Sequence, residues 1–572
     1  YRAFFPSLSL VILMTFFLAQ LWLHQYIFLY ADDLYYSRDA QYGLNYLPYF
    51  IIEQLNLNGR VWVATAMFFV LKHQIYLFRI LNPIILLLTV IILAKMSSFD
   101  EKIEKTPYWG VSLLCGCLFF LYLPLPIAHT TIYYAACAFN YLYPMTLALL
   151  YGYWLYTAPL RRKIPLLFLS FFLASSTQQV GMIGIGYTVM IAIYLSYMIK
   201  RFPISTFIPY FFLQLIGYTI LSYGSFQRLL SEKAAGNEAA LGEVVSELIR
   251  TNIFSLPAAP FVALICLSCI FWLWHRDYSA NPFNRFLGFA LSLATIGYLY
   301  LLLNENTLLQ LQGENTLALV RIAALAFILI YLFTILYVSY LFLRRGQTPF
   351  HFFNSINAIG AQLMLLVVDA RFAAAYKVMF PSLLLLSVFI FYSIATFRRN
   401  FFYLVLALSV ITLLPYSPRF FSHYHNLFPL YTELLPWYPL TGEVRFVGFL
   451  VTLIVVLVII LVIVSAPNTP FKTKLLSQGK KNFSYALGVL FILYTLAVFS
   501  QTIAGYYLVS IPQNYNLQAI ASYHEKGREG ELVLKKVPVS YYGYNLGNWQ
   551  TMPHFLKECY KIKEDTPIRY LE

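Results

Sequence analysis

The stretch FFPSLSLVILMTFFLAQLWLHQYIFLYADDLYYSRDAQ, residues 4–41, joins a long apolar run to a short charged one. The apolar part, Phe4 to Leu29, exceeds the roughly 20 helical residues that cross a hydrocarbon core. It is too long for a signal peptide and has no small-residue cleavage site, so we expect a first transmembrane helix here. Two adjacent carboxylates, Asp32 and Asp33, follow it. The sequence therefore predicts an acidic pair at the end of that helix, where it emerges into water.

The composition of the whole chain agrees with a membrane protein. Of 572 residues, 60% are hydrophobic, 19% are aromatic and only 11% are charged, whereas soluble domains carry roughly 25% charged residues. The formal charge of +15 would suggest nucleic acid in a soluble protein. Much of it lies in short basic clusters between apolar runs, which indicates membrane topology instead, so no nucleic-acid partner is expected.

Apolar runs long enough to span a bilayer recur along the chain and predict about fifteen transmembrane helices. The expected spans are 4–29, 76–95, 109–124, 142–159, 164–177, 180–199, 204–222, 255–274, 286–304, 316–342, 352–368, 378–396, 401–415, 446–465 and 484–505. The basic clusters at 161–163, 200–201, 344–345, 398–399 and 472–481 then all fall on the cytoplasmic side. The N-terminus is expected inside and the C-terminus outside.

This pattern predicts an all-α polytopic membrane domain, residues 1–504, followed by a small extracytoplasmic α/β domain, residues 505–572. In the second domain we expect a helix at 515–526 and a strand at 531–537. The first outer loop, residues 31–74, carries the acidic pair. Within it, Val61 to Leu71 is apolar but too short to span, so we expect an interfacial helix.

Four short motifs appear in order along the predicted outer face. They are Asp32-Asp33, Asn58-Gly59-Arg60, IYYAACAFNYLYP at 132–144 and SSTQQ at 175–179. This order resembles the GT-C superfamily of membrane glycosyltransferases, and in particular the bacterial branch related to O-antigen glucosyltransferases. The sequence departs from the family pattern at Tyr133 or Tyr134 for a tryptophan, near Cys137 for a glycine, and at Thr177 for a glutamate.

The resemblance implies a function at the outer leaflet of the bacterial cytoplasmic membrane. A hexose would pass, with inversion, from a polyprenyl-phosphate carrier to a cell-envelope glycan or glycopolymer, and Asp32 or Asp33 would be the general base. Carried over onto the matching motifs, the substrate-binding residues would be Asn58, Arg60, Tyr134, Asn140, Tyr141, Gln178 and Gln179. A further segment, SYGSFQRL at 222–229, keeps the glycine and the arginine, Arg228, of a family motif.

The same chemistry follows from the residue types alone. A sugar hydroxyl that attacks an anomeric carbon needs a base, and a carboxylate at a membrane-facing cleft can serve. We expect Asp32 to be the less exposed of the pair because it lies nearer the helix end. The alternative is a solvated helix C-terminus without a role, although the helix dipole disfavours acids there.

A lipid-phosphate leaving group requires directed cationic donors. Four outer-face arginines are candidates: Arg60, Arg228, Arg371 and Arg419. Arg371 is favoured because it should lie at headgroup depth, with Lys377 nearby. The alternative for each is that the side chain only extends toward lipid headgroups.

No cofactor is expected, although a divalent metal stays open as an alternative. His129, His423 and His425 lack zinc spacing with a carboxylate, and Cys266 and Cys269 lie in an apolar run where helix packing explains them. Two other functions remain. An O-antigen polymerase or ligase usually has one large late loop, and a transporter or flippase usually places charge at the bilayer midplane.

Overall fold

The computed structural model describes most of the chain and leaves several segments undescribed. The described residues are 4–29, 31–72, 75–99, 109–234, 241–255, 257–303, 318–345, 347–367, 373–396, 499, 502–528, 530–536 and 553–571. The predicted spans 401–415 and 446–465 lie outside them, as does most of 484–505.

The described part of the chain is mainly helical, as the apolar runs predict, and its helices support a polytopic membrane protein. Four of these helices are long and apolar enough to cross a membrane, judged by length and composition: 76–97, 178–198, 322–344 and 376–396. Helices suit such segments because lipid offers no partner for backbone N–H and C=O groups, so each segment must satisfy its own. In order, the elements are α5 (Tyr76–Ser97), α11 (Gln178–Ile193) with η3 (Tyr194–Met198), α18 (Ala318–Arg344), and η6 (Tyr376–Met379) with α21 (Phe380–Thr396).

Other helices lie within or across further predicted spans. They are α1 (Phe4–His24), α6 (Trp109–Tyr122), α9 (Leu142–Thr157), α10 (Lys163–Ala174), α12 (Ile208–Ala234), α14 (Ala259–Trp274), α16 (Pro282–Leu303) and α19 (Phe350–Leu363). Short connecting helices are α7 (Leu125–Ala128), η2 (His129–Tyr133), α8 (Ala135–Asn140), η4 (Ile204–Thr206), α15 (Arg276–Ser279) and η5 (Met364–Val367).

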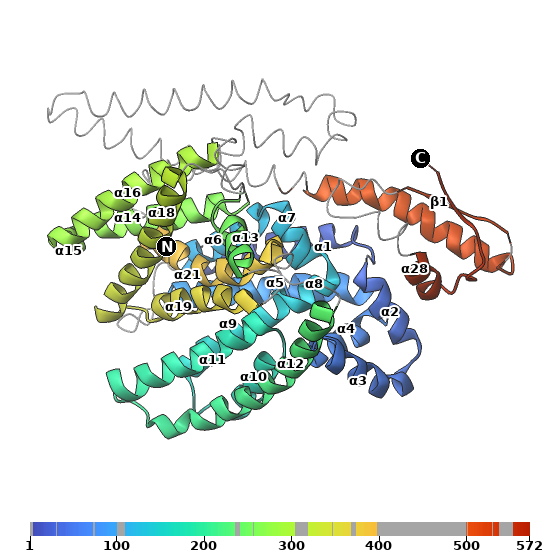
Figure 1. Ribbon diagram of the computed structural model, residues 1–572, viewed down its shortest axis with the longest axis horizontal. Coiled ribbons are helices and arrows are strands. Elements are labelled where there is room, and N and C mark those ends of the chain that lie inside the picture. The colour runs from blue at the N-terminus through green and yellow to red at the C-terminus, as the bar shows by residue number, and fades with distance from the viewer. Residues whose placement is uncertain are drawn as a thin grey trace.

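The helices pack in groups around a central set. Helix α5 contacts α1, α6, α9 and α21. Of the four long apolar helices, the one at 376–396, which includes α21, is the most enclosed, with 89% of its apolar stretch buried. Figure 1 shows α14, α16 and α18 on one side of this centre and α10, α11 and α12 on the other. Buried polar pairs join central helices, for example Thr89 and Thr146, whose hydroxyl oxygens lie 2.6 Å apart.

Most of the described residues between the predicted spans 204–222 and 255–274 are helical. Helix α12 continues to Ala234, and α13 (Leu241–Asn252) follows after a short gap. Helix α13 buries Val244 and Leu248 against Leu365 and Val378, so it forms because its apolar residues recur at helical spacing. The prediction erred because it ended the span at the first polar residues.

The segment after α1 corrects a second expectation. Helix α1 ends at His24, and the acidic pair opens a new helix, α2 (Asp32–Gln41). It is followed by η1 (Leu44–Tyr46), α3 (Leu47–Leu57) and α4 (Val61–Leu71), the last with the bounds that the sequence predicts. The acids therefore lie at a helix N-terminus, where the macrodipole favours negative charge, and not at a C-terminus.

The C-terminal segment combines helices with two short strands. A helix covers 502–525, so it runs across residue 505, where the sequence places a domain boundary. Strand β1 (Leu532–Lys535) lies within the predicted strand and pairs in parallel with β2 (Ile568–Leu571), with Leu532 opposite Ile568. Helix α28 (Pro553–Cys559) lies between them in the sequence and contacts α2, beside which Figure 1 shows it.

Candidate active site

The backbone makes an unusual turn just before the acidic pair. Ala31 has a φ of 48°, a left-handed conformation that residues with a β-carbon rarely adopt. Ala31 directly precedes α2, which starts at Asp32. Strained backbone of this kind persists only where the surrounding contacts hold it, and it is common at functional sites.

Asp33 is a buried structural carboxylate. Its side chain has 0% exposure, and its Oδ1 accepts a hydrogen bond of 2.7 Å from the backbone N–H of Ala136. Ala136 is the second residue of α8, whose first N–H groups have no partner within the helix. Asp33 therefore caps α8 from a different element and ties the first outer loop to the 132–144 motif.

Asp32 is exposed, so the prediction that it is the less exposed acid is wrong. The reason is that α8 covers Asp33, the second residue of α2, and leaves the first one open. The backbone N–H of Asp32 donates a hydrogen bond of 3.0 Å to the hydroxyl of Tyr134. Burial and the charges of Asp32 and Asp33 raise the pKa of Tyr134, so its phenol stays protonated.

Arg60 draws three of the predicted motifs together. Its Nη1 donates to Oδ1 of Asn140 at 3.0 Å, and its Nη2 donates to Oε1 of Gln178 at 3.2 Å. Its backbone N–H donates to Oδ1 of Asn58 at 2.8 Å. Its Nε is buried and has no hydrogen-bond partner among the described residues. The guanidinium is thus held by neutral amides and keeps a donor and its positive charge for another anion.

The turn that carries Arg60 is fixed by close backbone packing. Gly59 has a φ of 72°, and a β-carbon there would come within 2.4 Å of the carbonyl oxygen of Leu221 in α12. Glycine is therefore required at this position both for its conformation and for its contact. Asn58 has a local role, because its side chain accepts the N–H of Arg60 and so shapes the turn.

Lys377 is the cation that the sequence did not select. It lies in η6, half-buried, and interacts electrostatically with Asp32 and Arg60 as well as with Cys137 and Tyr141. The sequence names it only as a neighbour of Arg371. A lysine at the start of an apolar helix was the available signal, because ionisable residues in membrane segments are usually functional.

Gln179 has a different role from its neighbour Gln178. It is buried, and its Nε2 donates to the carbonyl oxygens of Ala361 at 3.2 Å and Val378 at 2.9 Å. Val378 directly follows Lys377. Gln179 therefore holds the segment that carries the lysine, and the two glutamines of the SSTQQ motif position one cation each.

We call the group formed by Asp32, Arg60, Lys377, Tyr134, Asn140 and Gln178 the carboxylate–cation cluster. Tyr36, Cys137 and Tyr141 border it, since each interacts electrostatically with one or more of its charges. Burial raises the pKa of the Cys137 thiol to about 12, so this residue is not a thiolate nucleophile. The cluster combines an exposed carboxylate, Asp32, with two cations, Arg60 and Lys377, that lie within electrostatic range of the same residues.

The structure places one more of the predicted phosphate-binding arginines, Arg228. Arg228 is in α12, three residues after Ser225, whose hydroxyl accepts the amide N–H of Gln178. The contacts that define the cluster do not include it. Arg371 and Arg419 lie outside the described residues.

Metal ligands do not gather in the described part of the chain. Within it, no group of three or more His, Cys, Asp or Glu side chains could hold a metal ion. His129 instead forms a 2.8 Å hydrogen bond through Nδ1 with the hydroxyl of Tyr506. Cys266 and Cys269 are free thiols buried in α14, which confirms that they pack within a helix.

Comparisons with known proteins add no assignment. No family model, no curated protein and no solved structure matches this chain. A function therefore has to be proposed from the geometry of its own residues.

Proposed function

We propose that this protein is a GT-C-type membrane glycosyltransferase. It moves a sugar from a polyprenyl-phosphate carrier to a cell-envelope glycan or glycopolymer on the outer face of a bacterial cytoplasmic membrane. In this proposal the residues beyond 505 form an extracytoplasmic unit, and the chain has about fifteen spans. The sugar and the acceptor are left unassigned.

The observation that carries the proposal is the carboxylate–cation cluster. Asp32 is exposed, its charge attracts that of Lys377, and the charge of Arg60 repels that of Lys377, so the three groups lie within electrostatic range of one another. These residues come from three distant parts of the sequence. A base and two cations in one place are what a reaction needs when it deprotonates a hydroxyl and releases an anionic phosphate.

Each group has a role in this chemistry. Asp32 accepts the proton of the acceptor hydroxyl as its oxygen attacks the anomeric carbon. The bond between that carbon and the phosphate oxygen breaks, and Arg60 and Lys377 stabilise the negative charge on the leaving lipid phosphate. Asn140 and Gln178 orient the guanidinium, while Asp33 fixes α8 and with it Asn140. No metal is required for these steps.

Transfer of label tests the proposal directly. The purified protein would be incubated with a radiolabelled polyprenyl-phosphate hexose and cell-envelope polymer, with a polyprenyl-diphosphate sugar in a parallel reaction. We expect label to enter the polymer from the monophosphate donor only, and the Asp32→Asn variant to be inactive. Transfer from the diphosphate donor alone would favour a polymerase or ligase, and transfer by neither donor with any hexose would contradict the proposal.

The proposed orientation has its own test. Tyr42 is 62% exposed just after α2, and Leu160 is 58% exposed beside the basic cluster at 161–163. A cysteine at position 42 should react in intact cells with a reagent that does not cross membranes. A cysteine at position 160 should react only after the membrane is opened, and the reverse pattern would exclude an outer-face site.

A further inference from the structure

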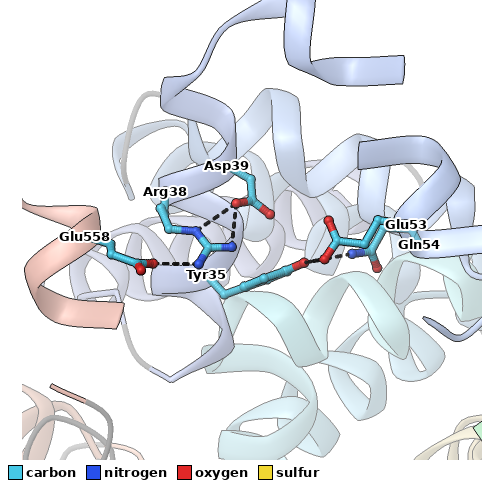
Figure 2. A network of polar contacts seen from close by, with 6 residues as sticks. All are labelled: Tyr35, Arg38, Asp39, Glu53, Gln54 and Glu558. Carbon is cyan, nitrogen blue, oxygen red and sulfur yellow. Dashed lines mark hydrogen bonds and ion pairs between the residues drawn. The ribbon is translucent and has the colours of Figure 1, made fainter. Parts of the chain in front are cut away.

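The C-terminal segment holds the acidic-pair helix at its far end. Nη1 of Arg38 in α2 donates to Oε2 of Glu558 in α28 at 2.6 Å, and Figure 2 shows Arg38 between Glu558 and Asp39. Nε2 of Gln41 donates to the carbonyl oxygen of Cys559 at 2.8 Å. The Arg38 guanidinium also lies over the rings of Tyr35 and Phe555, at 4.6 Å and 5.7 Å from their centroids.

The same segment reaches the near end of α2 through a second route. Tyr506, in the helix at 502–525, is fully buried and hydrogen-bonds to His129. The His129 ring stacks parallel to that of Tyr134, with centroids 6.1 Å apart and an interplanar angle of 6°. Tyr134 in turn accepts the backbone N–H of Asp32. Both ends of the ten-residue helix are thus tied to one distant stretch of chain.

We propose that Glu558 and Tyr506 are positioning residues that set the place of Asp32 in the carboxylate–cation cluster. They act through Arg38 and through His129 and Tyr134. This inference rests on the proposed function, because it assumes that Asp32 is the reacting group. It adds a requirement for the C-terminal segment in the chemical step.

The geometry explains how such contacts can control rate. A helix of this length moves nearly as a rigid body, so releasing one end shifts the residue at the other. A misplacement of about 1 Å at a reacting group can cost on the order of a hundredfold in rate. The Arg38–Glu558 pair itself is partly exposed, at 18% and 48%, and such pairs contribute little to folding.

Glu558→Gln and Tyr506→Phe are the variants that test the inference. Each removes one link and preserves the size of the side chain. In the transfer assay we expect kcat to fall about tenfold for each, with the KM for the labelled polyprenyl-phosphate hexose unchanged. Glu531→Gln is the matched control, since Glu531 pairs with Arg569 inside the C-terminal segment. Equal effects of Glu558→Gln and Glu531→Gln, or a rise in KM alone, would overturn the inference.

A disulfide can replace the lost contact and report docking without any activity measurement. Nε2 of Gln41 lies 3.9 Å from Sγ of Cys559, so Gln41→Cys should cross-link to Cys559 on oxidation, whereas Gln41→Cys with Cys559→Ala should not. Glu558→Gln should slow cross-linking, and the disulfide should restore kcat in that variant. A restored link without restored kcat contradicts the positioning role.

The two proposals fail in different ways. If Asp32→Asn transfers sugar as well as the wild type, Asp32 is not the general base and the proposed function is contradicted. If Asp32 is required and Glu558→Gln keeps full kcat, only the positioning role of the C-terminal segment is wrong.

Discussion

Helix α2 has an adjacent charged pair at each end, and the two pairs are satisfied differently. At the N-terminal end, Asp33 is buried against the N–H of Ala136 while Asp32 is exposed. At the C-terminal end, Asp39 is buried against Arg38, and Arg38 also binds Glu558 (Figure 2). Asp33 accepts a backbone N–H, whereas Arg38 and Asp39 form an ion pair with each other.

The difference shows what makes a charged pair available to a ligand. Arg38 forms ion pairs with both Asp39 and Glu558, so its guanidinium has little left to offer a substrate. At the other end, Arg60 binds neutral amides, and both it and Lys377 keep their positive charge beside an exposed carboxylate. Among the described contacts Arg38 binds carboxylates and Arg60 binds side-chain amides, and this difference, not the number of charged residues, distinguishes the two ends.

The largest expected effect separates the two members of the acidic pair. Asp32→Asn keeps the size of the side chain and removes the base, so kcat should fall by on the order of a hundredfold or more. The measurement is label transfer by detergent-purified protein, with thermal unfolding to verify the fold. Near-normal turnover of this variant would contradict the assignment of Asp32 as the general base.

Replacing Asp33 should lower the stability of the fold, which replacing Asp32 should leave nearly unchanged. Asp33→Ala leaves the buried N–H of Ala136 without an acceptor, which costs about 1–3 kcal/mol of unfolding free energy. Asp32→Ala, at an exposed position, should change stability by less than about 0.5 kcal/mol. Thermal unfolding of both variants in the same detergent makes the comparison, and equal losses would show that burial does not separate the two acids.

The cations should act on the donor. Lys377→Met should raise the KM for the polyprenyl-phosphate sugar about tenfold, because the protein loses one of the positive charges that bind the donor phosphate. Lys377→Arg, which keeps the charge, is the control and should retain most donor affinity. Arg371→Ala keeps its sequence-based prediction of weaker donor use. If Lys377→Met changes donor and acceptor KM equally, its role is in folding.

The smallest expected effect is on the pH dependence of stability and concerns Asp39, at the C-terminal end of α2. Burial is the main cause that raises the pKa of Asp39 above its ordinary value of 3.8, although Arg38 opposes it. The folded protein then holds this proton to higher pH than the unfolded chain, so stability falls as pH rises through the window just above 3.8. Asp39→Asn should flatten that decline by a fraction of a kcal/mol in pH-dependent unfolding curves. An unchanged slope would contradict the raised pKa.

Much of the helical framework could be predicted from apolar runs, and α4 was predicted with its bounds. The errors occurred where polar residues continue a helix, as in α12, or begin one, as in α2. Polar residues next to a span predict a loop. Such a segment can still form a helix when one of its faces is apolar and buried, as in α13. For the site, the short motifs identified Asp32, Arg60, Asn140 and Gln178, while Lys377 has no neighbouring motif.

The sequence by itself determined the class of the protein, because a chain with 60% hydrophobic residues and repeated long apolar runs satisfies its backbone in lipid as helices. It also determined which polar motifs were candidates. Only the tertiary structure decided which acid is open, which cations face it and what holds α2. Those properties depend on partners far away in the chain, such as the N–H of Ala136 for Asp33 and the carboxylate of Glu558 for Arg38. Exposure and charge pairing are decided by such contacts, which residue spacing does not encode.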